Sequence, residues 1–283
     1  MHRKKSFETS EPKLYLVPTP IGNLQEMTPR ALEVLKEADV IAAEDTRNSG
    51  KLLMAYGIKK PLISHHEHNQ NTSIAQILEE LENGKTVAVV SDAGYPLISD
   101  PGQSLVKAVI EKDIPVISVS GANAATNALV ASGLSCRHYL FYGFLDAKSS
   151  KRKKELEELK SFPYTVIFYE APHRIEAMLK DVVEVLGDRN ICLARELTKV
   201  HEEYIRGTVS EVISIADTLK GEMVVVVEGN TEPEKNYTLD DGIQKVDENI
   251  KAGMKTKAAI AQAAKDFELS KNELYEYYHK QGK

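Results

Sequence analysis

The stretch TVAVVSDAGYPLISDPG, residues 86–102, decides the fold class of this 283-residue chain. It begins with the run TVAVV, typical of a buried strand. A polar loop follows, in which a glycine comes two residues after each of Asp92 and Asp100. Glycine lets the backbone approach a ligand closely. Open α/β folds bind ligands in such loops, at the carboxyl ends of parallel strands. The stretch therefore predicts an α/β ligand site, with a plain turn capped by its aspartates as the alternative.

The composition is that of an ordinary globular protein, with 42% apolar and 28% charged residues. The length suggests about two domains. The net charge of −6 lacks the positive sign that is typical of nucleic-acid-binding proteins. Any RNA contact must therefore use local basic patches. No apolar run approaches the roughly 20 residues of a membrane span. The two cysteines form no framework and favour a reducing cytoplasm.

The first half of the chain alternates short apolar runs with helical patterns. Thr28 and Pro29 have the residue types of an N-cap and first helical position. Ser73 and Gln76 have the spacing of a capping box. We expect strands at residues 14–17, 40–43, 61–64, 86–90, 115–119 and 139–144.

Charged and histidine-rich segments follow two of these strands. Residues 44–47, EDTR, predict either a functional site or a helix start with acids at its positive end. Residues 65–68, HHEH, lack the helical H-E-x-x-H spacing of a zinc site, and no distant Cys/His pair completes a set. We therefore predict no metal, and expect substrate contact or surface polarity for the histidines. The small residues at 120–124 indicate either an anion site or close helix–sheet packing.

A break in composition at residues 146–161 predicts a domain boundary that leads into a helix. Its basic cluster, Lys151, Arg152, Lys153 and Lys154, is a candidate phosphate contact, with a solvated helix start as the alternative.

The second half of the chain predicts another α/β unit with less regular connections, and so a mixed sheet. Strands are expected at residues 165–169, 191–194, 203–212 and 223–227, the last of them central. Residues 230–236 have the composition of a linker. Two short helical patterns beyond it are similar to a helix-turn-helix, with nucleic-acid contact, packing and dimerisation as possible roles.

Seven motifs, in their order and spacing, carry a family resemblance. They are PTPIGN, RALEVLKEADVIAAEDTR, SDAGYPLISDPG, SGANA, FYGFL, FYEAPHR and ARELTK. Together they resemble the tetrapyrrole methylase superfamily and, within it, the ribosomal RNA small-subunit methyltransferase I family. The similarity covers about residues 14–229, and the segment ending in AEDTR separates this family from the corrin, sirohaem and diphthamide methylases.

The resemblance implies two α/β domains of the tetrapyrrole methylase (class III methyltransferase) type, with a small C-terminal helical appendage. We divide the chain into a disordered tail (1–13), an N-terminal α/β methylase domain (14–145), a second α/β domain (146–229), and a linker with a helical domain (230–283). The resemblance also implies a homodimer that uses S-adenosylmethionine (AdoMet) to methylate the ribose 2′-oxygen of a cytidine in the decoding region of 16S rRNA.

Candidate residues follow from these motifs. For AdoMet binding they are Pro20, Gly22, Asp92, Ala93, Gly94, Ile98, Ser99, Asp100, Gly121, Ala122, Phe144, Leu145, Tyr169, Ala194, Arg195, Glu196 and Leu197. A ribose hydroxyl is a very weak acid, so catalysis needs a well-placed, desolvated carboxylate or a cation that stabilises the alkoxide. Glu44, Asp45 and Arg47 are the first choice for this role, with Glu170 and His173 second.

Three other functions compete with this prediction. The nearest is an AdoMet-dependent methyltransferase that acts on a tetrapyrrole or a protein side chain. A non-catalytic RNA-binding protein would need no two-domain ligand cleft. A nicotinamide dehydrogenase is disfavoured, because no G-x-G-x-x-G follows the first strand.

Overall fold

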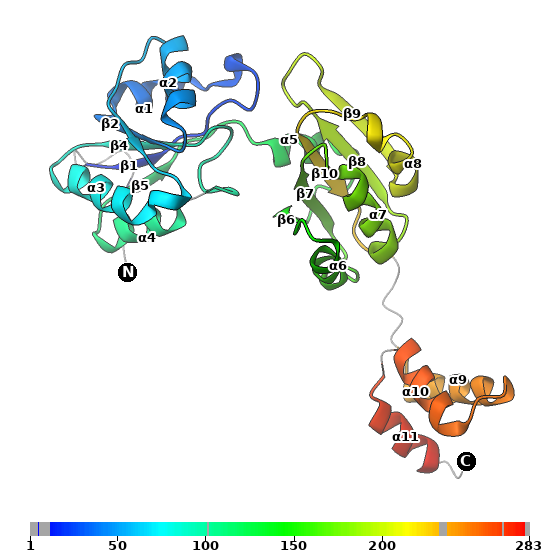
Figure 1. The fold of residues 1–283 in the computed structure, drawn as a ribbon. Helices are drawn as coiled ribbons and strands as arrows, with labels where there is room; N and C mark the ends of the chain where they lie inside the picture. The colour runs from blue at the N-terminus through cyan, green and yellow to red at the C-terminus, as the bar shows by residue number, and fades with distance from the viewer. Residues whose placement is uncertain (1–4, 6–11, 101, 232–236, 268, 281–283) are drawn as a thin grey trace. The chain divides into compact units, whose positions relative to one another are not determined.

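The computed structural model describes residues 5, 12–100, 102–231, 237–267 and 269–280 (Figure 1). The predicted tail therefore lies almost entirely outside the described residues, as does most of the predicted linker. The chain divides into two compact units, Met1–Thr231 and Glu232–Lys283. The first unit contains two sheets.

The first sheet has five parallel strands in the order β3-β2-β4-β1-β5. Its strands are β1 (Leu14–Leu16), β2 (Val40–Ala43), β3 (Leu62–Ser64), β4 (Val87–Val90) and β5 (Val116–Ser118). Each was predicted, within one or two residues at its ends. Side chains of β4 alternate between two cores, since Val87 and Val89 pack on one face, and Ala88 and Val90 on the other.

Helices cover both faces of this sheet, as expected of a parallel sheet (Figure 1). Apolar side chains of α1 (Pro29–Glu37) and α2 (Thr46–Ala55) pack on one face. Those of α3 (Gln70–Glu82) and α4 (Gln103–Glu111) pack on the other. Two short 3-10 turns, η1 (Leu24–Glu26) and η2 (Glu67–Asn69), precede α1 and α3.

One predicted helix cap is confirmed and one is wrong. Thr28 caps α1 by accepting a hydrogen bond from the Ala31 N–H at 3.1 Å, with Pro29 at the first helical position. Ser73 does not cap α3, because that helix begins one turn earlier, at Gln70. The Ser73 hydroxyl instead lies 2.8 Å from the buried ring of His65 and hydrogen-bonds to the Asn69 carbonyl oxygen.

The second sheet is mixed, as predicted, in the order β6-β7-β10-β8-β9. It comprises β6 (Tyr139–Phe144), β7 (Thr165–Glu170), β8 (Asn190–Arg195), β9 (Glu203–Thr208) and β10 (Met223–Val227). β6 is parallel to β7, and the other pairs are antiparallel. The predicted central strand, β10, lies between β7 and β8.

Two expectations differ from this sheet. The strand predicted over 203–212 ends at Thr208, because Thr208 and Glu211 form a capping box that starts α8 (Val209–Ile213). β6 was grouped with the first domain, yet it pairs with β7 in the second sheet. The hydrogen-bonded partner of a strand depends on long-range pairing, so the change of sheet falls before β6 rather than at residue 146.

The second sheet is also covered on both faces. Its larger core packs against α6 (Ser149–Glu158), α7 (Ile175–Leu186) and α8. Its opposite face packs against α5 (Ala124–Ser132). A short 3-10 turn, η3 (Ala216–Thr218), leads toward β10.

The C-terminal unit has a core of its own. Its described helices are α9 (Leu239–Lys251), α10 (Thr256–Asp266) and α11 (Lys271–Lys280). Buried side chains of all three, among them Val246, Ile260 and Leu274, form one cluster.

Candidate functional site

A cavity of about 480 Å³ in the first unit collects motifs from both sheets. This volume lies in the usual range of small-molecule sites. Its walls contain Ile21, Glu44, Asp92, Ala93, Gly94, Tyr95, Ile98, Ser99, Asp100, Asn123, Ala124, Phe144, Tyr169, Glu170, Ala171, Pro172, Glu196, Leu197, Lys199, Glu222, Met223 and Val224. The polar loop after β4 thus faces residues at, or just beyond, the ends of β6, β7 and β8.

Two backbone contacts hold the loops on the first-sheet side of the cavity. Thr19 and Gly94 form an antiparallel bridge, with N–H···O distances of 2.9 and 3.0 Å. The Gly94 φ of +74° is strained for residues with a side chain. The Gly121 N–H donates to the Tyr95 hydroxyl at 3.1 Å, and a Cβ on Gly121 would lie 2.7 Å from Pro18 Cβ. Glycine is therefore required at 121 by the close approach of two loops.

Non-glycine residues in and beside the cavity have left-handed backbone conformations. They are Leu97 (φ 75°), Ser99 (64°), Glu196 (50°) and Thr198 (67°). Such conformations cost free energy and persist where the surrounding structure imposes them, often in ligand sites. Two of these residues, Ser99 and Glu196, lie in the cavity wall.

Three carboxylates, Glu44, Asp92 and Asp100, lie on the first-sheet side of the cavity. Burial, and then the charge of Glu44, raise the pKa of Asp100 to about 6. Burial, and then the charge of Asp92, raise the pKa of Glu44 above its ordinary value. In the described part of the chain, none of the three has an ion-pair partner. The cavity therefore holds negative charge that a cationic ligand would neutralise.

Glu170 contributes a buried carboxylate from the end of β7. The side chain is 1% exposed, and its Oε1 lies 3.2 Å from the Nε of Arg174. The same Oε1 accepts the Ala171 N–H at 2.9 Å. Oε2 is buried and has no hydrogen-bond partner within the described residues. A buried acceptor without a partner is costly, so a ligand hydroxyl or amine would find a ready acceptor in this wall.

The other two residues of the first-choice catalytic set lie outside the cavity wall. Asp45 caps α2 by accepting the N–H groups of Arg47 and Asn48 at 2.8 and 3.4 Å. The first of these bonds lowers the pKa of Asp45 below its ordinary value. The Arg47 side chain is 87% exposed and lies 3.5 Å from Asp45. For these two residues the helix-start interpretation matches the structure. His173, the second-choice partner of Glu170, is also absent from the wall.

The structure brings most of the AdoMet candidates together. Those in the wall are Asp92, Ala93, Gly94, Ile98, Ser99, Asp100, Phe144, Tyr169, Glu196 and Leu197. Gly121 and Ala122 lie just outside it, beside Asn123 and Ala124, which do line it.

Three AdoMet candidates lie outside the wall of the larger cavity. Leu145 is buried in the second sheet's larger core, with its carbonyl oxygen accepting a bond from Arg174. Ala194 packs in the opposite core, against α5. Arg195 lies 22% exposed beside Glu203 and outside the wall. Ala194 and Arg195 are consecutive residues of β8 and point to opposite faces of the sheet, and which face meets a ligand depends on strand pairing.

Several wall residues were missed by the sequence analysis. Tyr95, Asn123 and Lys199 belong to motifs that were quoted, and only their orientation was unknown. Lys199 pairs with Glu196 at 3.1 Å and Glu222 at 3.5 Å. Met223 and Val224 begin the central strand and had no local signal beyond their apolar character.

Pro20 and Gly22, also AdoMet candidates, lie on a second and smaller cavity of about 140 Å³. Its wall also includes Leu24, Asn48, Ser49, Leu52, Ser91 and Asp92. Asp92 belongs to both cavities.

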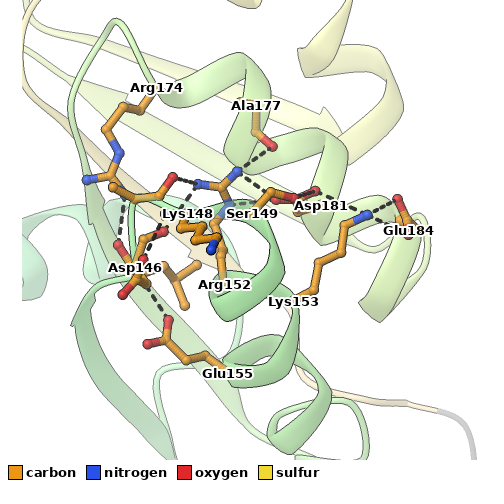
Figure 2. A network of polar contacts seen from close by, with 12 residues as sticks. Asp146, Lys148, Ser149, Arg152, Lys153, Glu155, Arg174, Ala177, Asp181 and Glu184 are labelled. Atoms are coloured by element: carbon orange, nitrogen blue, oxygen red, sulfur yellow. Dashed lines mark hydrogen bonds and ion pairs between the residues drawn. The ribbon is translucent and has the colours of Figure 1, made fainter.

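The Arg152 guanidinium is buried between α6 and α7, so it is not exposed for a phosphate contact (Figure 2). Its Nε donates to Asp181 Oδ2 at 2.7 Å, and two further bonds reach the carbonyl oxygens of Asp146 and Ala147 at 3.2 Å. The Lys153 Nζ donates a hydrogen bond to Glu184 on α7 at 2.6 Å. Lys151 is exposed but lies 3.4 Å from Asp146. Lys154 is exposed, so it remains the best phosphate candidate of the cluster.

One residue of the histidine segment departs from the surface role that was one of its expectations, while Glu67 and His68 are exposed. His65 is only 2% exposed, and burial lowers its pKa. Its Nε2 has no partner in the described structure. Across the described residues, no group of three or more His, Cys, Asp and Glu side chains could hold a metal ion.

Comparisons with known proteins identify the family. Residues 13–213 match the model of the Tetrapyrrole (Corrin/Porphyrin) Methylases. The ribosomal RNA small subunit methyltransferase I of Bacillus subtilis (strain 168) is 49% identical over 273 residues, covering 94% of each chain. The chain belongs to the ribosomal RNA small subunit methyltransferase I family. A second member, from Synechocystis sp., is 43% identical over 93% of this chain and 96% of its own.

Solved structures confirm the predicted fold class of this family member. A cobalt precorrin-4 methyltransferase aligns with a TM-score of 0.59 at 16% identity, over 76% of this chain and 94% of its own. A Thermus thermophilus uroporphyrin-III C-methyltransferase, solved with S-adenyl homocysteine, aligns at 0.55 and 18% identity, over 76% of this chain and 97% of its own. At these identities the similarity concerns the fold alone. No helix in the described part of this family member is long and apolar enough to cross a bilayer.

Proposed function

We propose that the protein transfers a methyl group from AdoMet to the ribose 2′-oxygen of a cytidine in the decoding region of 16S rRNA. As a member of its family, it is an AdoMet-dependent methyltransferase of small-subunit ribosomal RNA. The proposal adds the acceptor atom and the nucleotide. The alternative acceptors, a tetrapyrrole or a protein side chain, belong to more distant branches of the fold.

The observation that carries the proposal is the charge of the larger cavity. AdoMet is cationic at its sulfonium and its ammonium group. Glu44, Asp92 and Asp100 supply negative charge and form no ion pair among the described residues, and of the histidines only the charge of His66 acts on Glu44. Such a wall favours a cationic cofactor over an anionic dinucleotide.

The residues present also fit the rest of AdoMet. Ile98, Leu197, Met223 and Val224 offer an apolar surface for a nucleobase. The rings of Phe144 and Tyr169 lie edge to face, with centroids 5.6 Å apart. The free Oε2 of Glu170 is an acceptor for a cofactor hydroxyl or amine. We therefore assign Glu170 to cofactor binding rather than to catalysis.

When bound, AdoMet supplies a methyl group on a sulfonium that leaves as a neutral thioether. The protein aligns the acceptor oxygen with that methyl group and removes the hydroxyl proton. Glu44 is the proposed proton acceptor, because it lies in the wall and its pKa is raised by burial and by Asp92. Asp45, with its lowered pKa and its role in capping α2, orients the start of the helix beside Glu44.

We also propose that the protein is a cytoplasmic homodimer that reaches the 16S rRNA through Lys151 and Lys154. The dimer is supported by the family resemblance, and the cytoplasmic location by the unpaired Cys136 and Cys192. Both lysines project from the exposed side of α6. Sedimentation velocity tests the dimer, since a monomer at micromolar concentration would contradict it.

The reaction can be tested with labelled AdoMet and small ribosomal subunits from a strain that lacks this gene. The RNA is digested to nucleosides after incubation. We expect label in 2′-O-methylcytidine and in no other nucleoside. Glu44→Gln should lower turnover by about 100-fold or more, the usual contribution of a general base, with AdoMet affinity changed far less. Glu37→Gln, an exposed site on α1, is the matched control.

Two results would contradict the proposal. Label absent from RNA, with AdoMet binding intact, would redirect the search to small-molecule or protein acceptors. Full turnover of Glu44→Gln would leave the reaction in place and remove Glu44 as the base.

A further inference from the structure

The smaller cavity shares a wall residue with the cofactor cavity. Asp92 lines both, while Pro20, Leu24 and Leu52 give the smaller one apolar surface. At about 140 Å³ it is below the range of sites for drug-sized ligands, and its volume suits a single ring. A group bound here would therefore lie next to the larger cavity.

A buried hydroxyl without a partner lies in this cavity. Ser49, on the first turn of α2, is 3% exposed and lines the wall. Its Oγ is buried, and it has no hydrogen-bond partner among the described residues. Leaving a buried polar group unpaired costs about 1–3 kcal/mol, so such groups indicate a missing partner. A ligand with polar atoms on its edge would supply one.

The neighbouring residue, Asn48, presents a defined polar group. Its Nδ2 donates to Asp92 Oδ2 at 3.1 Å, from a residue 44 positions away. A carboxylate only accepts hydrogen bonds, so the amide must turn its NH₂ toward Asp92. The amide oxygen is thereby turned away from Asp92, on a residue that lines the smaller cavity.

From these contacts we infer that the smaller cavity binds the nucleobase of the target nucleotide, and that Asn48 selects cytosine over uracil. This inference rests on the proposed function. Cytosine carries an exocyclic amino group that donates to an acceptor, where uracil carries a carbonyl oxygen. The Asn48 oxygen accepts a hydrogen bond from the cytosine amino group and repels the uracil carbonyl oxygen. The Ser49 hydroxyl both donates and accepts, so it binds either base.

The apolar residues have a role in the same site. Enzymes that act on one nucleotide often extrude it and hold the base in a fitted pocket by stacking and edge contacts. Pro20, Leu24 and Leu52 offer faces for stacking. Leu24 is 50% exposed, so its side chain is accessible to a ligand that enters the cavity.

The test compares two substrates and two variants of the full-length protein. Small subunits from the gene-deleted strain carry either cytidine or uridine at the target position, and single-turnover methylation is measured with labelled AdoMet. The wild type should prefer cytidine. Asn48→Ala should lose about tenfold in rate on cytidine and little on uridine, as expected for one lost hydrogen bond. Ser49→Ala should lose a similar factor in methylation rate on both cytidine and uridine.

Controls separate this role from general damage. Both variants should bind AdoMet with wild-type affinity by calorimetry. Met54→Ala, on the exposed side of α2 and outside both cavities, should leave both rates unchanged.

Three outcomes would overturn the inference. In the first, Asn48→Ala methylates cytidine at the wild-type rate with the wild-type preference over uridine, while the proposed function stands. In the second, AdoMet affinity falls by the same factor as the rate, which would place Asn48 in the cofactor site. In the third, the wild type puts no label on cytidine, and the proposed function falls as well.

Discussion

Single residues in the cavity are tuned by each other's charge. Glu44 raises the pKa of Asp100, and Asp92 raises the pKa of both Glu44 and Asp100. A cationic ligand reverses this effect, because it stabilises the ionised forms. The acids thus couple ligand binding to proton release.

Affinity for AdoMet should therefore depend on pH through Asp100. Its folded pKa of about 6 lies above the ordinary 3.8, so it is protonated below pH 6 in the free protein and ionised above. We expect AdoMet to bind more tightly as pH rises from 5 to 7, by at most tenfold per pH unit for one proton. Calorimetry across this range measures the slope, and Asp100→Asn should flatten it.

The raised pKa of Asp100 gives the stability of the ligand-free protein the opposite dependence on pH. A carboxyl whose pKa is raised by folding favours the folded state at low pH, and that contribution is lost as pH rises between about 4 and 6. Asp100→Asn should thus raise the melting temperature at pH 7 without ligand. Glu111→Gln, exposed on α4, is a control, and an equal pH slope in wild type and Asp100→Asn would contradict the assignment.

Among the elements, α6 and α7 depend on a buried ion pair. Arg152, 4% exposed at its side chain, meets Asp181 at 9%, with Ser149 donating to the same carboxylate (Figure 2). The pair satisfies charges that water cannot reach. A basic residue in a polar helix is therefore part of the core here.

Arg152→Ala should destabilise the protein by about 3 kcal/mol, because it removes the buried partner of Asp181 and leaves that carboxylate only the more distant Lys153 at 3.6 Å. Chemical denaturation measures this loss. Lys154→Ala, two positions along the same helix and exposed, should change stability by less than about 0.5 kcal/mol. If both variants lose stability equally, burial of the pair is not the cause.

At the scale of the whole molecule, the two compact units have separate cores. All wall residues of the larger cavity lie between Ile21 and Val224, within the first unit. A chain ending at Thr231 should therefore bind AdoMet with the affinity of the full-length protein. Calorimetry on both chains tests this, with circular dichroism to verify folding of the shorter one. A loss of affinity above about tenfold, in a folded chain, would show that the C-terminal unit contributes to the site.

Local patterns were enough to predict most of the elements. Apolar runs bounded by turn residues located the strands from β1 to β5, and Thr28 with Pro29 located the start of α1. Burial of alternate side chains and capping of free N–H groups depend on residues close together in the chain. They can therefore be predicted from local sequence patterns. The motifs likewise predicted a site around the loop after β4, and ten of the seventeen AdoMet candidates lie in one wall.

Contacts between distant residues accounted for the rest. β6 joined the second sheet, Arg152 turned inward to Asp181, and Leu145 and Ala194 turned into cores. Asn48 acquired its orientation from Asp92, 44 residues away. Each of these depends on which surfaces meet across the fold, because strand pairing and charge burial are decided by partners that no local pattern specifies.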